Sequence, residues 1–349
     1  MTASEVTIDD VARAAGVSPS TVSRVLSGRT NVAQVKRELV LKTVREMGYL
    51  PNPTARVLAG GRSMSIGVLT QDITSPFYGE VIHGIQQGLQ NSFYLPLFAS
   101  GHWDLDAEDS AFRMLMSRRV DALIVLGTHT PDEDLLAVAQ KMPVVTVGRR
   151  IEGNPFPGYK LDNVKAARTA VRHLLSLGHQ RVAHIAGPMH HSDARDRLEG
   201  YRQELAAARL PYDERIVVEG DFMETSGLLA LEALISRGAP FTAIFSANDQ
   251  MAFGARLALF RRNLRVPEDI SLMGFDDIPG SSFTTPPLTT IRQPNFDLGV
   301  AAAQAVLNFL QDQPARAAAF SADLVVREST ARSRMNPPGT RRRAARELP

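Results

Sequence analysis

Residues 18–24, SPSTVSR, set hydroxyl side chains and one arginine along a short helical pattern. Hydroxyl groups of this kind suit contacts with DNA phosphates, and they are supplied by Ser18, Thr21 and Ser23. Arg24 suits the edge of a guanine, with Pro19 and Ser20 placed beside it to meet bases. An ordinary helical hairpin would also produce this pattern, so the stretch indicates DNA recognition only in combination with other features.

A second set of polar and aromatic residues falls at or just beyond the ends of predicted strands. It comprises Arg197, Phe222, Asn248, Asp276 and Gln293. Open α/β sheets bind ligands at the carboxyl ends of their strands. Polar groups of these types suit vicinal hydroxyls, and an aromatic ring suits the apolar face of a sugar. Taken singly, each polar residue could be a solvated loop residue or a helix cap, as Asn248 could be for a helix at 249–261.

Signals of enzyme chemistry are weak. The His190-His191 pair has no supporting ligands and fits a polar loop better than a metal site. The carboxylates of GHWDLDAED, residues 101–109, fit the start of a helix at 106–118. Glycine-rich phosphate loops, G-x-S-x-G and H-E-x-x-H are absent, and the chain has no cysteine. We therefore expect no catalytic residues, no metal site and no cofactor, in a protein that is not an enzyme.

Three helices are predicted within residues 7–47. Thr7 can cap the first helix, with Asp10 in capping-box spacing, and the second begins after Ser18. Residues 33–47 predict the third helix. The first two meet at Ala15-Gly16-Val17, as in a helix-turn-helix that presents its second helix to the major groove.

Residues 50–63, LPNPTARVLAGGRS, predict a short helix at 53–59, with Asn52 as its cap and Gly60-Gly61 after its end. A helix of two turns is marginal in water and forms only when it is held. Leu58, near its end, could enter the minor groove and kink a base step. It could equally pack as a linker residue.

Apolar runs of strand length alternate with helical patterns from Ser65 to Phe275. Strands are predicted at 65–70, 94–100, 121–127, 143–148, 182–187, 215–220, 242–247 and 270–275. Helices are predicted at 77–91, 106–118, 132–140, 163–177, 194–209, 225–237 and 249–261. This order predicts two parallel sheets covered by helices, with a break in the Gly- and Pro-containing segment 149–162. Extended segments at 286–294 and 321–328 flank a last helix at 296–311.

Charge is distributed unevenly along the chain. Residues 1–62 hold nine Lys or Arg against five Asp or Glu, and residues 332–349 hold six Arg against one Glu. Since the whole chain carries +2, the middle carries −7. A basic head on an acidic body suggests a polyanionic partner, although chance surface composition would also explain it. We see no signal peptide and no membrane-spanning run, and therefore expect a cytoplasmic protein.

Six stretches carry a family resemblance, and they are TIDDVARAAGVSPSTVSRVLSG, GYLPNPTARVLAGGRSMSIGV, LGHQRVAHIAGP, ANDQMAFGA, RVPEDISLMGFDD and PPLTTIRQP. In this order, from about residue 6 to 330, they resemble the lactose-repressor/galactose-repressor family of bacterial transcription regulators. The resemblance implies an α/β protein with a helix-turn-helix headpiece, a hinge helix and a two-lobed core like that of periplasmic sugar-binding proteins.

The implied domains are a headpiece at 1–50, a hinge at 51–62, one lobe at 63–162 with 292–320, a second lobe at 163–291 with 321–331, and a disordered basic tail at 332–349. The resemblance also implies a homodimer on a pseudo-palindromic operator. The tail lacks a leucine heptad, so we do not expect the tetramer that some members form.

Pattern and resemblance together predict two sets of site residues. DNA contacts are predicted at Thr7, Ser18, Pro19, Ser20, Thr21, Ser23, Arg24, Asn31, Asn52 and Leu58. Effector contacts are predicted at Phe77, Tyr78, Asp193, Arg197, Phe222, Asn248, Asp276 and Gln293. Two positions depart from relatives. Gly148 stands where several sugar-responding members carry an acid, and His191 stands where a purine-responding member carries an arginine.

We therefore predict a DNA-binding transcription regulator, in this family most often a repressor, controlled by a small effector between two lobes. A sugar, sugar acid or polyol is favoured as the effector, and a nucleobase is the alternative. Effector binding would change the lobe angle and so the spacing of the hinge helices. The main rival function is that of a solute-binding protein, against which the basic headpiece argues.

Overall fold

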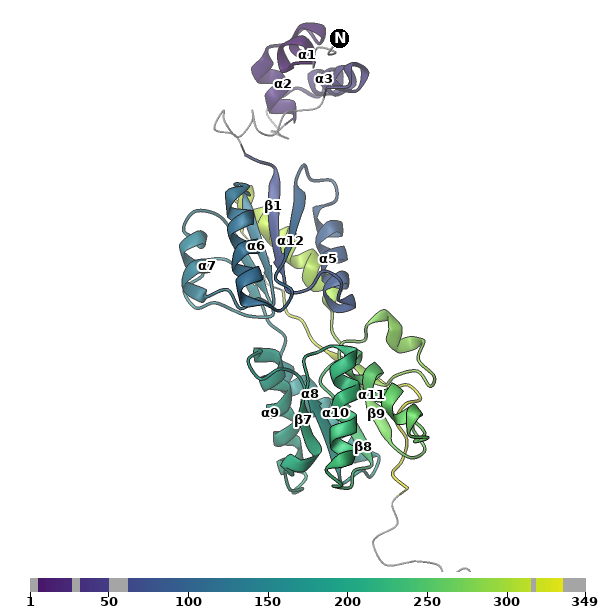
Figure 1. The fold of residues 1–349 in the computed structure, drawn as a ribbon. Helices are drawn as coiled ribbons and strands as arrows, with labels where there is room; N and C mark the ends of the chain where they lie inside the picture. The colour runs from purple at the N-terminus through teal and green to yellow at the C-terminus, as the bar shows by residue number, and fades with distance from the viewer. Residues whose placement is uncertain (1–5, 27–31, 50–61, 315–317, 335–349) are drawn as a thin grey trace, which may run out of the picture. The chain divides into compact units, whose positions relative to one another are not determined.

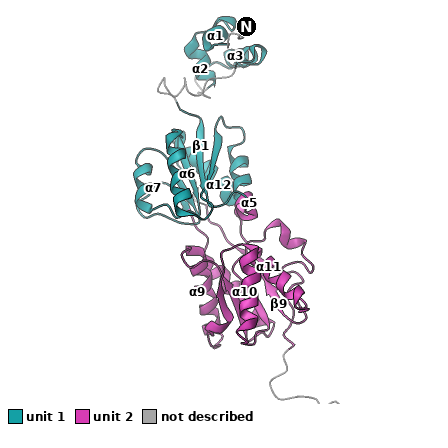
Figure 2. Cartoon of the chain, in the orientation of Figure 1, with its two compact units in different colours: residues 1–74, 81–158, 296–317 teal, residues 75–80, 159–295, 318–349 magenta. Residues whose placement is uncertain are grey.

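The computed structural model describes residues 6–26, 32–49, 62–314 and 318–334 (Figure 1). The chain divides into two compact units (Figure 2). Unit 1 comprises residues 1–74, 81–158 and 296–317, and unit 2 comprises residues 75–80, 159–295 and 318–349. The predicted fold class is confirmed, since a helical N-terminal region precedes two parallel sheets, each with its own helices.

Three helices form the N-terminal region, namely α1 (Ile8–Ala14), α2 (Pro19–Leu26) and α3 (Gln34–Met47). Their shared core is small and consists of Val11, Ala12, Ala15, Val22, Val25 and Val40. The turn between α1 and α2 depends on Gly16, whose φ of +61° lies in the left-handed region that favours glycine. Helices this short gain most of their stability from packing against one another, so the three depend on this common core.

The rest of unit 1 is built on a five-stranded sheet in the order β2-β1-β3-β4-β5. Its strands are β1 (Ser65–Thr70), β2 (Leu95–Ser100), β3 (Ala122–Leu126), β4 (Val144–Val147) and β5 (Gly158–Tyr159). Its helices are α6 (Leu105–Ser117), α7 (Asp132–Ala139), α12 (Asn295–Leu310) and most of α5 (Pro76–Leu89), whose first residues up to Glu80 belong to unit 2. β1 pairs in parallel with both β2 and β3, which places three strand ends at one edge.

Unit 2 is built on a four-stranded parallel sheet in the order β7-β6-β8-β9. Its strands are β6 (Val182–Ala186), β7 (Val217–Glu219), β8 (Ala243–Ser246) and β9 (Ser271–Met273). Its helices are α8 (Asn163–Ser176), α9 (Ser192–Ala207), α10 (Glu224–Ser236) and α11 (Asp249–Arg261). A separate antiparallel pair joins β10 (Thr290–Arg292) to β11 (Asp323–Val325).

Two details of the predicted elements were wrong. The strand predicted at 215–220 begins later, because Asp213 caps a 3-10 turn (Glu214–Ile216) and β7 follows it. The segment 149–162, predicted only as a break, contains the two-residue strand β5. Beyond β11, the amide of Ser333 donates to the carbonyl of Leu177, so the described chain is held as far as this residue. The predicted hinge helix lies outside the described residues.

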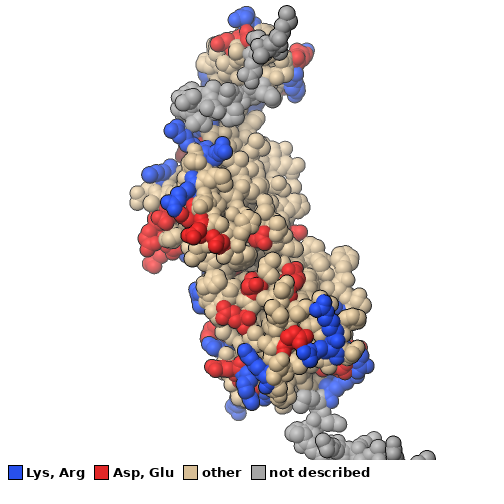
Figure 3. All heavy atoms as spheres, in the orientation of Figure 1, with Lys and Arg blue, Asp and Glu red and all other residues tan. Residues whose placement is uncertain are grey.

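Charged side chains of both signs are spread over the face drawn in Figure 3. Acidic groups gather over α7, whose first turn holds Asp132, Glu133 and Asp134. Negative side chains in a first helical turn favour the helix, because they face the positive end of its dipole. None of the helices in the described part of the chain is long and apolar enough to cross a membrane.

Candidate DNA-binding helix and ligand site

Helix α2 has one buried face and one exposed face, and the predicted DNA contacts lie on the exposed one. Val22 and Val25 are buried in the headpiece core. The exposed residues include Ser18, Pro19, Ser20, Ser23 and Arg24, and Thr21 is half-buried. The Nε atom of Arg24 donates to the carbonyl of Ser20 at 3.2 Å, which lays the guanidinium along the helix. The helix can thus present hydroxyls and a cation to a polyanion without losing its core.

Thr7 has a capping role in the structure. Its hydroxyl accepts from the amide of Asp10, and the Asp10 carboxylate accepts from the amide of Thr7 at 3.0 Å. These hydrogen bonds lower the pKa of Asp10. The capping box predicted from the sequence is therefore present. Three other predicted DNA contacts, Asn31, Asn52 and Leu58, lie outside the described residues.

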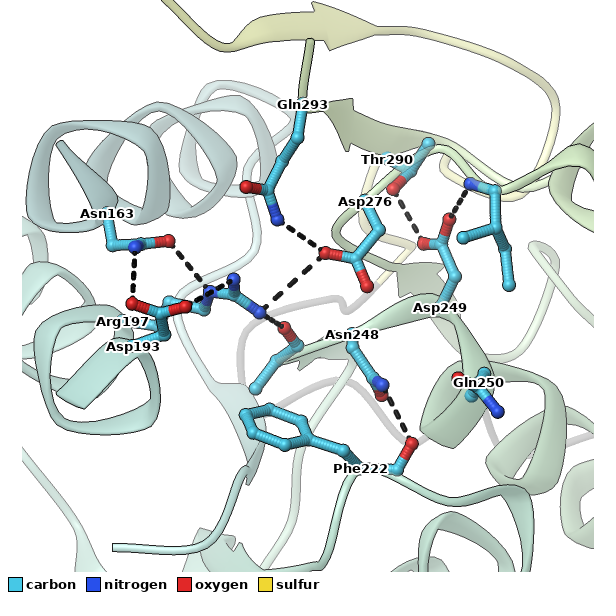
Figure 4. A network of polar contacts seen from close by, with 12 residues as sticks. Asn163, Asp193, Arg197, Phe222, Asn248, Asp249, Gln250, Asp276, Thr290 and Gln293 are labelled. Carbon is cyan, nitrogen blue, oxygen red and sulfur yellow. Dashed lines mark hydrogen bonds and ion pairs between the residues drawn. The ribbon is translucent and has the colours of Figure 1, made fainter. Parts of the chain in front are cut away.

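In unit 2, six of the eight predicted ligand residues converge around the buried guanidinium of Arg197 (Figure 4). Its Nη1 atom donates to the carbonyl of Ala247 at 2.7 Å, just beyond the end of β8. Carboxylates lie on two sides, with Asp276 at 3.8 Å and Asp193 at 4.0 Å. Phe275 lies under the guanidinium, whose carbon is 4.0 Å from the ring centroid. The side chain of Arg197 is therefore fixed by contacts on several sides.

Asp276 extends this network beyond the end of β9. Its Oδ1 atom accepts from the side chain of Gln293 at 2.7 Å. Burial raises the pKa of Asp276 well above that of an ordinary carboxyl, and the nearby Arg197 opposes the rise. Asp276 also has a φ of +117°, outside the range that L residues usually adopt. Such strain is maintained only where the surrounding structure determines it, as at binding sites.

Phe222 and Asn248 complete the network at the ends of β7 and β8. The ring of Phe222 lies 5.9 Å from the guanidinium carbon of Arg197 and meets His191 edge to face. Asn248 caps α11 by accepting from the amide of Met251, and its Nδ2 atom donates to the carbonyl of Phe222 at 2.8 Å. The capping alternative raised for Asn248 is thus realised in the structure.

The two remaining predicted ligand residues lie at the start of α5. Phe77 and Tyr78 meet edge to face, with ring centroids 5.0 Å apart. The contacts described above join the other six predicted residues. Tyr78 is buried and Phe77 is half-buried. The start of α5 therefore contributes two aromatic rings, of which only that of Phe77 is partly exposed.

Sequence reasoning missed Asn163 at the first turn of α8. Its Oδ1 atom accepts from Nε of Arg197, and its Nδ2 atom donates to Asp193, both at 3.0 Å. Asn163 therefore bridges the arginine and the acid that lie one helical turn apart on α9. The one available signal was the Asp162 cap before it, which marks a helix start but gives no indication of a partner on α9.

A second polar cluster missed from the sequence lies at the carboxyl edge of the unit 1 sheet, around the buried Glu108 of α6. The carboxylate accepts from the side chain of Gln71 at 2.8 Å and from the amide of His129 at 3.0 Å. It also accepts from the amide and the hydroxyl of Thr130. Burial by itself would raise the pKa of Glu108, but the hydrogen bonds from His129 and Thr130 outweigh it and lower the pKa to about 2.

The described ranges contain no group of three or more His, Asp or Glu side chains arranged to hold a metal ion. The fold and the two sets of residues define a class: a DNA-binding headpiece joined to a core that resembles small-molecule-binding proteins. Comparisons agree with this class. Residues 7–52 match the family model for bacterial regulatory proteins of the lacI family, and residues 63–327 match that for periplasmic binding proteins and the sugar-binding domain of the LacI family.

Individual relatives match over nearly the whole chain. The transcriptional repressor CytR of Escherichia coli K12 is 34% identical over 327 residues, 93% of this chain and 96% of the relative. The lac repressor dimer bound to operator and the anti-inducer ONPF has a TM-score of 0.78 at 32% identity, covering 94% of this chain and all of that one. The regulator CelR in complex with cellobiose has a TM-score of 0.69 at 31% identity, covering 93% and 99% of the two chains. The protein belongs to the LacI family of transcription regulators.

Proposed function

We propose that the protein is a transcriptional repressor whose affinity for operator DNA is set by a small polyhydroxylated effector. The observation that carries this proposal is the Arg197 network, in which a buried cation and two carboxylates share one sheet edge. Groups of both signs, held rigidly beside an aromatic ring, suit a ligand that both donates and accepts hydrogen bonds. The proposed effector residues are Phe77, Tyr78, Asp193, Arg197, Phe222, Asp276 and Gln293.

The charge balance of the network favours a neutral effector over a sugar acid. Asp193 and Asp276 flank the single guanidinium of Arg197 at 4.0 and 3.8 Å. The raised pKa of Asp276 favours its protonated form, and the carboxylate of Asp193 by itself compensates the cation, so an anionic ligand would add an uncompensated buried charge. A neutral sugar or polyol instead gives the carboxylates hydroxyl donors and gives the guanidinium hydroxyl acceptors.

The proposed DNA-binding part is the headpiece at 1–50 with the hinge at 51–62. The exposed face of α2 supplies the base-reading residues Pro19, Ser20 and Arg24, and a cytoplasmic location follows from a role at DNA. Effector binding changes operator affinity only through its different affinity for the two states of the core. Removing residues 1–62 is then expected to abolish DNA binding. If the protein were a solute-binding protein, this deletion would leave its ligand binding unchanged and remove no DNA affinity.

We propose a homodimer as the DNA-binding species, as in the operator complex of the lac repressor dimer. In unit 2, large apolar side chains stand exposed on α11 and in the loop that follows β9. Leu257 is 44%, Phe260 is 78% and Phe283 is 86% exposed. Large apolar side chains that are exposed in the single chain often become the buried centre of an interface when a partner binds. A second copy of the chain is the proposed occupant of this surface.

A thermal-shift screen of the full chain tests the effector proposal. The panel contains neutral sugars, polyols, sugar acids, nucleosides and nucleobases, and Arg197→Met is tested beside Arg202→Ala. Arg202 is an exposed arginine on the same helix, so its variant controls for loss of charge from α9. We expect stabilisation by a neutral polyhydroxylated compound, retained in Arg202→Ala and lost in Arg197→Met. Stabilisation by a nucleobase alone would overturn the proposed effector class in favour of the purine-type alternative.

A further inference from the structure

Three consecutive residues at the start of α11, Asn248, Asp249 and Gln250, are buried polar residues. A helix start needs one capping side chain, and Asn248 supplies it. Three buried polar side chains in a row therefore exceed what the helix itself requires. Each of the three makes hydrogen bonds to at least one segment that carries proposed effector residues, and Gln250 also bonds Glu224, close to the segment bonded by Asn248.

Asn248 holds the segment that carries Phe222. Its Nδ2 atom donates to the carbonyl of Phe222 at 2.8 Å. Phe222 has a φ of +71°, a left-handed conformation that costs a residue other than glycine on the order of 1 kcal/mol. Its ring also lies against Gly187, where an added Cβ would stand 2.3 Å from a ring carbon. The unusual backbone of Phe222 is thus held from one side by Asn248 and its ring from the other by Gly187.

Asp249 holds the turn that carries Asp276 and the strand that leads to Gln293. Its Oδ2 atom accepts from the amide of Ile278 at 3.1 Å and the hydroxyl of Ser281 at 2.6 Å. Its Oδ1 atom accepts from the hydroxyl of Thr290 on β10 at 2.7 Å. Figure 4 shows the carboxylate between the Thr290 side chain and the turn. One fully buried carboxylate therefore ties α11 to two separate segments.

Gln250 holds the start of α5, which carries Phe77 and Tyr78. Its Oε1 atom accepts from the hydroxyl of Ser75 at 3.0 Å. Its Nε2 atom donates to Glu224 at 3.1 Å, two residues after Phe222. Residues 75–80 belong to unit 2, whereas α5 continues into unit 1 from Val81. Gln250 therefore bonds the unit 2 end of a helix that belongs to both units.

We propose that Asn248, Asp249 and Gln250 are positioning residues, each of which sets the place of a different group of effector residues. Asn248 then orients Phe222 as well as capping α11, and its predicted contact with a ligand stays a prediction. That the positioned residues bind an effector rests on the proposed function. The positioning itself does not, because it concerns hydrogen bonds that exist without any bound molecule.

Hydrogen exchange of the full chain, followed by mass spectrometry without any added compound, tests the inference. Asn248→Ser keeps a side-chain oxygen that can cap α11, but it loses the side-chain NH2 group that donates to the carbonyl of Phe222. We expect exchange to rise in segment 221–224, by about fivefold for the loss of one hydrogen bond, and to stay unchanged along α11. Asp249→Asn is expected to raise exchange in 276–281. Gln250→Met is expected to raise exchange in 75–80 and, since it also loses the hydrogen bond to Glu224, to a smaller extent around residue 224.

The matched control is Asp104→Ser, which makes a similar change of capping residue at α6 in unit 1. It should leave all three segments unchanged. If the Asp249 variant does not fold, Ser281→Ala and Thr290→Val remove two of the same hydrogen bonds from the partner side. A uniform rise along α11, or three segments that exchange as in the parent protein, would overturn the inference. Failure of the thermal-shift screen would overturn the effector class and leave this result standing.

Discussion

Replacing Glu108 by glutamine should destabilise unit 1 in a pH-dependent way. The carboxylate accepts hydrogen bonds from Gln71, His129 and Thr130, and its pKa falls from the ordinary 4.5 to about 2. This fall corresponds to about 3 kcal/mol of stabilisation of the folded state by the ionised form. Glutamine has one acceptor oxygen and turns an amide NH2 toward donors, so Glu108→Gln should lose about this amount at pH 7.

The direction of the pH dependence follows from the lowered pKa. Because the folded pKa lies below the unfolded one, the stabilisation is fully present above pH 4.5 and is lost as the pH falls toward 2. About 2 kcal/mol of it should be gone by pH 3 in the parent protein. Glu108→Gln should lack this loss, so the difference in stability between the two proteins should narrow on acidification.

Urea denaturation followed by tryptophan fluorescence measures this difference within unit 1. Trp103 is the sole tryptophan of the chain and lies in that unit. Glu133→Gln, at an exposed position on α7, is the control for loss of one carboxylate. The reasoning would be refuted by a Glu108→Gln protein as stable as the parent at pH 7, or by a stability difference that stays constant down to pH 3.

Three further changes test other parts of the molecule. Arg24→Ala should relax preference at one base pair per half-site by about 1–3 kcal/mol in binding-site selection from random DNA; unchanged preference would make Arg24 a phosphate contact. Gly254→Ala places a Cβ 1.8 Å from the Glu224 carbonyl oxygen, so calorimetry should show a loss of about 3 kcal/mol in the free energy of unfolding. Gly79→Ala, which has open space around the added Cβ, should lose no stability. Equal effects of the two variants would contradict the close packing of α10 against α11. Phe260→Asp should convert the dimer to monomer in sedimentation experiments, and an intact dimer would place the interface elsewhere.

Helix bounds and caps could be predicted from the sequence where they depend on interactions between residues close together in the chain. The bounds of α11 (Asp249–Arg261) match the prediction, because an Asn cap and a continuous helical pattern are both visible in the sequence. The strand β5 (Gly158–Tyr159) was missed, since two residues are too few to show any periodicity. The capping box of Thr7 and Asp10 was predictable for the same local reason, as its two residues are three positions apart.

The sequence by itself determined the family, the class of fold and which residue types stand at the strand ends. Only the tertiary structure decided which of them meet. Asp193 is one helical turn from Arg197, but Asp276 and Asn163 reach the same guanidinium from other segments. Helical and strand periodicity are properties of neighbouring residues, whereas these contacts depend on which strand ends are adjacent in the sheet. That adjacency arises from burial of side chains across the whole unit, which no short stretch of sequence contains.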